Sequence, residues 1–248
     1  MNLDPAQWIL AVVAALLVGI AKTGVTGLGM LPVAIYAQLL PAKQASGLLL
    51  PLLIVGDVIA VLTYRQHTQW RYLLRLFPWT AIGVVIGYFA MDRIDDREAR
   101  IIIGVIILVL VALHVGRKWW LSRRAARSEE PKHPVLVPAT GILAGFTTLM
   151  ANAAGPLMAM YLLAMRLPKL EFVGTAAMFF LVLNVFKVPF MMNLGLVNVS
   201  SVTANLILCP AVLLGAWLGR KLLSRLNQHW FENLALALAA AAGLKLLF

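Results

Sequence analysis

Ten apolar runs, separated by short polar gaps, constrain this chain more than any other feature of its sequence. They cover residues 8–21, 30–40, 47–64, 76–91, 101–116, 135–151, 154–165, 172–192, 204–219 and 230–248. A helix needs about 20 apolar residues to cross the hydrocarbon core of a bilayer. Of the 248 residues, 62% are hydrophobic and 12% are charged, against about half and about a quarter in soluble chains. The sequence therefore predicts an all-α, polytopic membrane protein, and the runs lack the alternation typical of β-barrel strands.

The charge pattern excludes several function classes. The net charge is +11, but Lys and Arg lie almost wholly in the gaps between apolar runs, as the orientation signals of membrane proteins do. We therefore expect no nucleic-acid partner. The single cysteine, Cys209, excludes an intrachain disulfide and a cysteine-clustered metal site. Because the four histidines are dispersed and no catalytic motif is present, we expect no metal, no cofactor and no enzymatic activity.

The chain contains an internal repeat. Gly19 and Gly29 are ten residues apart, as are Gly145 and Gly155. Two later steps repeat as well: Gly47 to Asp57 matches Gly174 to Asn184, and Pro78-x4-Gly83-x3-Gly87 matches Pro210-x4-Gly215-x3-Gly219. Because these matches occur in order, at offsets of 126 to 132 residues, they predict two homologous halves. The predicted halves are residues 1–116 and 135–248, joined by a basic linker at 117–134.

Four of the runs are too short for a comfortable crossing, and they form two adjacent pairs, 8–21 with 30–40 and 135–151 with 154–165. Each pair can form two full crossings, one broken crossing or a re-entrant hairpin. With the linker in the cytoplasm, hairpins place 14 basic residues inside and five outside, whereas broken crossings give 10 and nine. The positive-inside rule favours hairpins. Each half is then a hairpin followed by three transmembrane helices, and the two halves are inverted repeats.

The turns of the two pairs carry the candidate binding groups. The first contains Thr23, Gly24, Thr26, Gly27 and Gly29, and the second contains Thr148, Asn152 and Gly155. Non-helical backbone at membrane depth is tolerated where protein or a water-filled cavity satisfies it. Two half-helix N-termini would then face each other near mid-membrane, which predicts an anion site. The alternative is that the small residues only allow close helix packing.

Four polar residues lie within or beside the apolar runs. Lys22 borders the first turn, and Asp57 is the only carboxylate deep within a run; intramembrane charges of this kind are by default functional or paired. Because burial disfavours a charged carboxyl, we expect Asp57 to carry a proton coupled to transport. Asn184 is its repeat counterpart, and Lys187 follows it on the same helix face. Both lysines could instead extend to the membrane interface.

The chain resembles the TauE/SafE family of sulfite exporters, also called the toluene-sulfonate uptake permease group. The carrying features are the glycines of the first turn followed by Pro32, the Gly155-Pro156 step, and prolines 41 and 168 before the next helices. The chain departs from the glycine runs of this family with Lys22-Thr23 in one turn and with residues 150–154 in the other. The resemblance implies transport of small sulfur-containing anions, such as sulfite, sulfonates or sulfoacetate, across a bacterial inner membrane.

We therefore expect a secondary transporter that works by alternating access. Its expected anion-binding residues are Lys22, Thr23, Gly24, Thr26, Gly27, Gly29, Thr148, Asn152, Gly155, Asn184 and Lys187, with Asp57 as the proton carrier. Two alternatives stay open: a transporter of another small carboxylate or oxyanion, and a non-transporting subunit of a membrane complex. The expected partners are the small anion and the lipid bilayer, and a homo-oligomer stays open.

Overall fold

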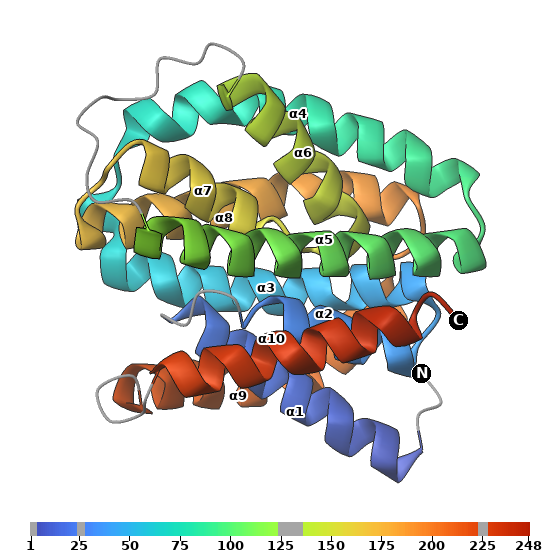
Figure 1. Cartoon of the computed structure of the whole chain (residues 1–248). Coiled ribbons are helices and arrows are strands. Elements are labelled where there is room, and N and C mark those ends of the chain that lie inside the picture. The colour runs from blue at the N-terminus through green and yellow to red at the C-terminus, as the bar shows by residue number, and fades with distance from the viewer. Residues whose placement is uncertain (1–3, 24–27, 124–135, 223–227) are drawn as a thin grey trace.

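The computed structural model describes residues 4–23, 28–123, 136–222 and 228–248, and these residues contain helices and no strands (Figure 1). The elements are α1 (Pro5–Lys22), α2 (Met30–Leu39), α3 (Ala42–Tyr64), the 3-10 turn η1 (Arg65–His67), α4 (Trp70–Arg93), α5 (Asp96–Arg123), α6 (Leu136–Ala151), α7 (Gly155–Ala164), α8 (Lys169–Asn193), α9 (Val199–Leu222) and α10 (Gln228–Lys245). The prediction of an all-α fold is confirmed. Helix α5 continues to Arg123, seven residues beyond the predicted end of the first half.

Local sequence signals explain where several helices begin. Asp4 caps α1, because its carboxylate accepts a hydrogen bond from the Gln7 backbone N–H at 2.8 Å. In return, the Gln7 side-chain oxygen accepts a hydrogen bond from the Asp4 backbone N–H. Asp95 and Glu98 exchange the same two bonds at the start of α5. The long helices α3 and α8 each follow a proline, Pro41 and Pro168 respectively. Reciprocal caps and prolines satisfy or remove the backbone donors that a helix start leaves unpaired.

Many outward-facing side chains are apolar. Leu62, Leu74 and Leu206 are each more than 60% exposed, although they lie within long helices. Six helices of the described residues are long and apolar enough to cross a membrane: α1, α3, α4, α5, α8 and α9. These helices, with an apolar outer face, define a polytopic membrane protein. The inclusion of α1 differs from the prediction that its run is too short, because Asp4 and Pro5 start the helix three residues before that run.

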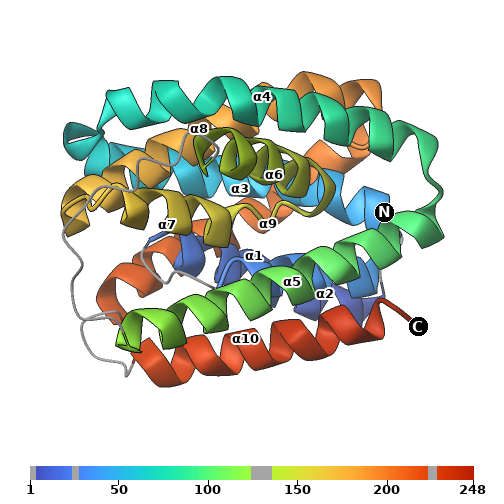
Figure 2. The same cartoon turned by 45° about the horizontal axis from the view of Figure 1, so that its top comes forward.

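The first pair of helices folds back on itself. Tyr36 near the end of α2 donates a hydrogen bond to the carbonyl of Ala11, in the first half of α1, at 2.9 Å, so α1 and α2 are antiparallel. Helix α2 has ten residues and is about 15 Å long, half of the bilayer core. Helices α6 and α7 form a similar hairpin that enters the molecule from the opposite end (Figures 1 and 2).

Each hairpin packs on a long helix of the other half. Helix α1 lies against α9, where a Cβ atom on Gly19 would overlap the backbone of Val212 and one on Gly215 would overlap that of Leu16. Helix α6 lies in the same way against α4, where Gly145 and Gly83 allow the contact. The absence of side chains at these four glycines allows the backbones of the paired helices to approach closely. Matching repeat positions thus make matching contacts across the molecule.

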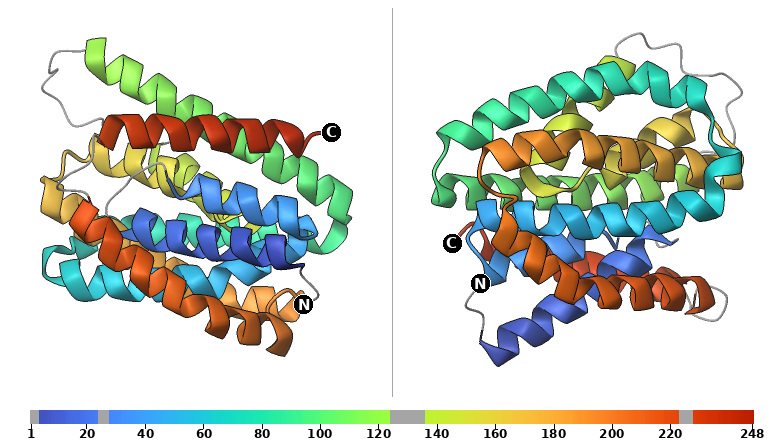
Figure 3. Two further views of the ribbon diagram at one scale, coloured as in Figure 1. Left: turned by 90° about the horizontal axis from the view of Figure 1, so that it is seen from below. Right: turned by 180° about the vertical axis from the view of Figure 1, so that it is seen from behind.

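Helices α3 and α8 lie side by side and antiparallel in the middle of the molecule. The start of α3 meets the end of α8 where Gly47 contacts Leu196, and the start of α8 meets the end of α3 where Gly174 contacts Tyr64. The start of α1 and the end of α10 lie at one end of the helix bundle, and the end of α5 lies at the other (Figure 3). This arrangement brings both hairpin tips to the middle of the α3–α8 pair.

Candidate functional site

An ion pair joins the first hairpin to α3. Lys22 is the last residue of α1, where a positive charge is favoured by the helix dipole. Its Nζ lies 2.6 Å from Oδ1 of Asp57 and 4.7 Å from the centre of the Phe180 ring. The Asp57 side chain is 1% exposed, whereas that of Lys22 is 16% exposed. The buried carboxylate therefore neutralises the charge of Lys22, whose side chain stays partly exposed.

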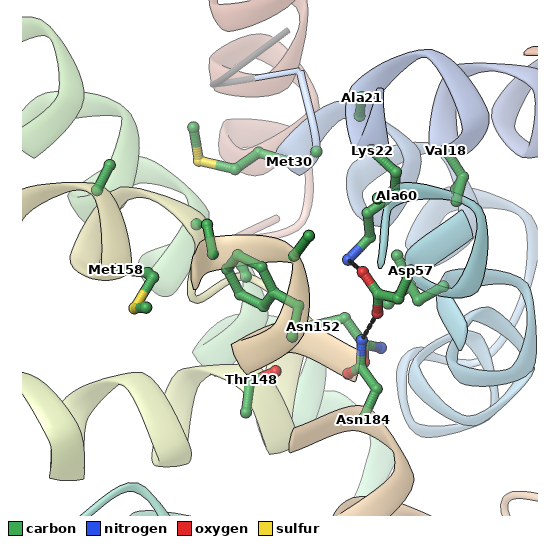
Figure 4. Close-up of a pocket in the computed structure, with 18 of the residues that line it drawn as sticks. Val18, Ala21, Lys22, Met30, Asp57, Ala60, Thr148, Asn152, Met158 and Asn184 are labelled. Atoms are coloured by element: carbon green, nitrogen blue, oxygen red, sulfur yellow. Dashed lines mark hydrogen bonds and ion pairs between the residues drawn. The ribbon is translucent and has the colours of Figure 1, made fainter. Parts of the chain in front are cut away.

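Asn184 on α8 links this ion pair to a second lysine. Its amide Nδ2 donates to Oδ2 of Asp57 at 2.6 Å, and its Oδ1 accepts from Nζ of Lys187 at 3.1 Å. A carboxylate that bonds to a lysine can only accept, so the amide orientation is determined by its two neighbours. The chain Lys22–Asp57–Asn184 is drawn in Figure 4.

Lys187 is completely buried, at 0% exposure. Its Nζ donates to the Thr148 carbonyl at 2.9 Å, Thr148 Oγ1 at 3.1 Å and Asn152 Oδ1 at 2.7 Å, besides Asn184. The alternative in which Lys187 extends to the membrane interface is therefore wrong. The ammonium instead fastens the second hairpin to α8.

Asn152 ends α6 and ties its tip to α3. Its φ of +50° lies in the left-handed region, which asparagine adopts at helix ends, and its backbone N–H donates to the Thr148 carbonyl at 2.9 Å. Its Nδ2 donates to the Ser46 carbonyl at 2.8 Å. Ser46 in turn donates through Oγ to the Leu149 carbonyl at 3.1 Å. The second tip is thus bonded to both central helices.

A cavity of about 180 Å³ lies between the two hairpin tips. This volume is below the roughly 300–1,000 Å³ of pockets that hold drug-sized molecules, so it suits a compact ligand. Among the residues that the structure describes, the polar lining consists of Lys22, Asp57, Thr148, Asn152 and Asn184. The starts of the half-helices α2 and α7 also line it, and Met30, Met158 and Phe180 form part of its apolar wall (Figure 4).

Most of the predicted site residues meet at this cavity. Those that line it are Lys22, Gly29, Asp57, Thr148, Asn152, Gly155 and Asn184. Lys187 lies behind the lining, and the Thr23 hydroxyl donates to the carbonyls of Gly19 and Ile20 in its own helix. Gly24, Thr26 and Gly27 lie outside the described residues.

Sequence reasoning missed three features of the site: the Lys22–Asp57 pair, Phe180 and Ser46. Phe180 stands four residues before Asn184 and so shares its helix face, a signal that the spacing contains. Ser46 is 106 residues from its partner Asn152 and has no comparable signal. The Lys22–Asp57 contact likewise joins two helices whose relative placement is a tertiary property.

The membrane-length helices and the cavity lined by charged groups between the two hairpins define a multi-pass membrane protein with a polar site inside its helix bundle. The chain belongs to the sulfite exporter TauE/SafE family, whose profile matches residues 10–246. No curated protein and no solved structure gives a significant match to the chain. The family assignment confirms the resemblance seen in the sequence and identifies the protein as a membrane transporter.

Proposed function

We propose that this protein is a secondary transporter of small sulfur-containing anions, such as sulfite, sulfonates or sulfoacetate, across a bacterial inner membrane. The observation that carries the proposal is the charge balance of the site. Lys22 contacts the carboxylate of Asp57, and Lys187 is linked to that carboxylate through the amide of Asn184. This cluster of two lysines and one carboxylate is positive by one charge when all three groups are ionised. An anion in the adjoining cavity would neutralise this excess in a setting with low dielectric constant.

The half-helix ends support an anion over a neutral solute. Gly29 and Met30 stand at the start of α2, and Gly155 and Pro156 at the start of α7, and all four line the cavity. Helix N-termini favour negative charge, because their dipoles and free N–H groups point outward. Thr148 and Asn152 add side chains that can bond to the oxygens of a sulfite or sulfonate group.

Asp57 is proposed to couple transport to protons. Its carboxylate contacts the ammonium of Lys22, the same group that an anionic substrate requires. Protonation of Asp57 would release Lys22 for the substrate, and deprotonation would restore the ion pair and favour substrate release. A proton and an anion would then move in the same direction.

The repeat arrangement supports alternating access. Because the hairpins enter from opposite ends of the helix bundle, each tip could open towards one side while the other stays closed (Figure 1). Arg65, Arg71, Arg166, Lys169 and Arg220 stand at helix ends on the side of the linker. By the positive-inside rule we place this side in the cytoplasm.

Purified protein in liposomes tests the proposal. We expect labelled sulfite or a small sulfonate to accumulate under an inward proton gradient, and Lys22→Ala to abolish the uptake. Lys245→Ala, at the exposed end of α10, is the matched control and should transport as the wild type does. Acetate and phosphate in the same panel decide between sulfur anions and other oxyanions. Absence of flux for every anion would favour a non-transporting subunit.

A further inference from the structure

The ammonium of Lys187 has an unusual set of partners. All four are oxygen atoms, 2.7 to 3.1 Å away: the Thr148 carbonyl, Thr148 Oγ1, Asn152 Oδ1 and Asn184 Oδ1. Three of these oxygens cannot donate a hydrogen bond, because they are carbonyl or amide oxygens. We call these four oxygens the oxygen shell of Lys187. The shell offers acceptors to every N–H of a charged ammonium group. A neutral amine would find at most one donor for its lone pair, the Thr148 hydroxyl.

The Thr148 carbonyl comes from a place that binds free cations in other transporter folds. Thr148 lies in the last turn of α6, where the helix dipole is negative. In inverted-repeat transporters, carbonyls at half-helix C-termini and unwound backbone coordinate the coupling ion. The Thr148 carbonyl accepts from the Asn152 N–H at 2.9 Å as well as from Lys187, so both of its lone pairs are used.

The shell is also formed independently of the lysine. The Asn184 amide is oriented by its bond to Asp57, and the Asn152 amide by its bond to the Ser46 carbonyl. Each Oδ1 therefore faces Nζ because its own Nδ2 is held elsewhere. Removal of the Lys187 side chain would leave the oxygens in place around an empty position.

We propose that these oxygens form a monovalent-cation site that the protein fills with its own ammonium group. Lys187 acts as a tethered cation, and a free ammonium, alkylammonium or alkali-metal ion can occupy the same shell when the tether is removed. The wild-type protein then needs no free cation at this position. This proposal stands independently of the transported anion.

Lys187→Ala is the variant that tests it, because propylammonium has the atoms that this substitution removes. We expect purified Lys187→Ala protein to bind labelled methylammonium saturably, with one ion per chain, and its melting temperature to rise by several degrees in propylammonium. A ligand that binds only the folded state raises stability in this way. Tetraethylammonium, which is too bulky for the shell, should give no shift.

Two controls separate cation binding from general salt effects. The wild type keeps its own ammonium, and Lys187→Met fills the space with apolar atoms, so neither should bind methylammonium or respond to propylammonium. Lys187→Ala protein that folds but binds no methylammonium, and whose melting temperature is unchanged in propylammonium, overturns the proposal. So does equal binding by Lys187→Met. If Lys187→Ala cannot be extracted in folded form, extraction is repeated with saturating propylammonium, and failure under that condition also overturns the proposal.

Discussion

At the first hairpin the lysine belongs to the tip: Lys22 ends α1 and reaches the carboxylate of Asp57 on the long helix α3. At the second hairpin the direction is reversed, because Lys187 on the long helix α8 reaches Thr148 at the tip of α6. Neither lysine has a lysine at the matching position of the other half. The repeat offset of 126 residues aligns Lys22 with Thr148. The offset of 127 residues, which relates Asp57 to Asn184, aligns Lys187 with Ala60. One backbone plan thus carries two different charge arrangements.

We call the Lys22–Asp57 contact the first junction and the contacts of Lys187 with Thr148 and Asn152 the second junction. The two junctions also differ in the burial of the lysine and in its number of partners. Lys22 is partly exposed, lines the cavity and has one carboxylate partner, which a proton or an anionic substrate can replace. Lys187 is fully buried, lies behind the cavity lining and has four acceptor oxygens within hydrogen-bonding distance of its Nζ. We infer that the first junction exchanges partners during transport and that the second holds its hairpin in place.

The largest expected contrast between the two hairpins is the side of the membrane from which each one enters. A cysteine on one side should react completely with a reagent that a cysteine on the other side does not meet. In a Cys209→Ser background, Asn198→Cys should react with an impermeant maleimide in intact cells, and Leu170→Cys should react only after permeabilisation. The two positions stand at opposite ends of α8, whose 25 residues are about 37 Å long. Labelling of both from the same side would contradict the inverted-repeat topology.

Loss of proton coupling is the next largest effect. Asp57→Asn keeps a hydrogen-bonding side chain but cannot ionise, so Lys22 loses the partner that competes with substrate. We expect anion binding to persist, and uptake in liposomes to lose its response to a pH gradient; in the wild type, acidification on the side of the substrate should accelerate uptake. Glu171→Gln, at the start of α8, is the matched carboxylate control. An unchanged pH dependence in Asp57→Asn would remove this residue from the mechanism.

The difference in stability between the junctions is tested by removing each lysine charge with a side chain of similar length. Lys187→Met leaves several buried oxygens unpaired and should lower the free energy of unfolding by at least about 3 kcal/mol, since each such loss costs about 1–3 kcal/mol. Lys22→Met should cost about 1.5 kcal/mol or less, because Asp57 keeps its bond to Asn184 and can take up a proton. The difference corresponds to a melting temperature about 4 °C lower for Lys187→Met. Equal melting temperatures would refute the assignment of a fixed second junction.

The smallest effect concerns the strength of anion binding at the first junction. Lys22→Ala should weaken sulfite binding at least tenfold, equivalent to about 1.4 kcal/mol. Lys22→Arg should restore only part of it, because the planar guanidinium is larger and fixed in geometry. Calorimetric titration of sulfite and a small sulfonate into both variants gives the measurement. Wild-type affinity in a well-folded Lys22→Ala protein would place the anion site elsewhere.

The sequence alone determined the all-α membrane fold, because long apolar runs admit few other structures and only four of the ten runs are too short for a comfortable crossing. It also drew attention to polar residues at the ends of the hairpin helices and within the long helix α3. Lys22, Asp57 and Asn152 stand out because polar groups are costly at membrane depth, so each needs a partner or a function. This argument is local and needs no three-dimensional information.

Only the tertiary structure decided which of these groups are partners. Asp57 could have paired with either lysine through the sequence alone, and the packing of α1 against α3 gave the ionic contact to Lys22. The antiparallel α3–α8 pair placed Asn184 between Asp57 and Lys187, and the fold of the second hairpin enclosed Lys187 in oxygens. Hydrogen bonds act over about 3 Å between groups that are far apart in the chain, so their pattern follows from helix placement and cannot be deduced from residue types.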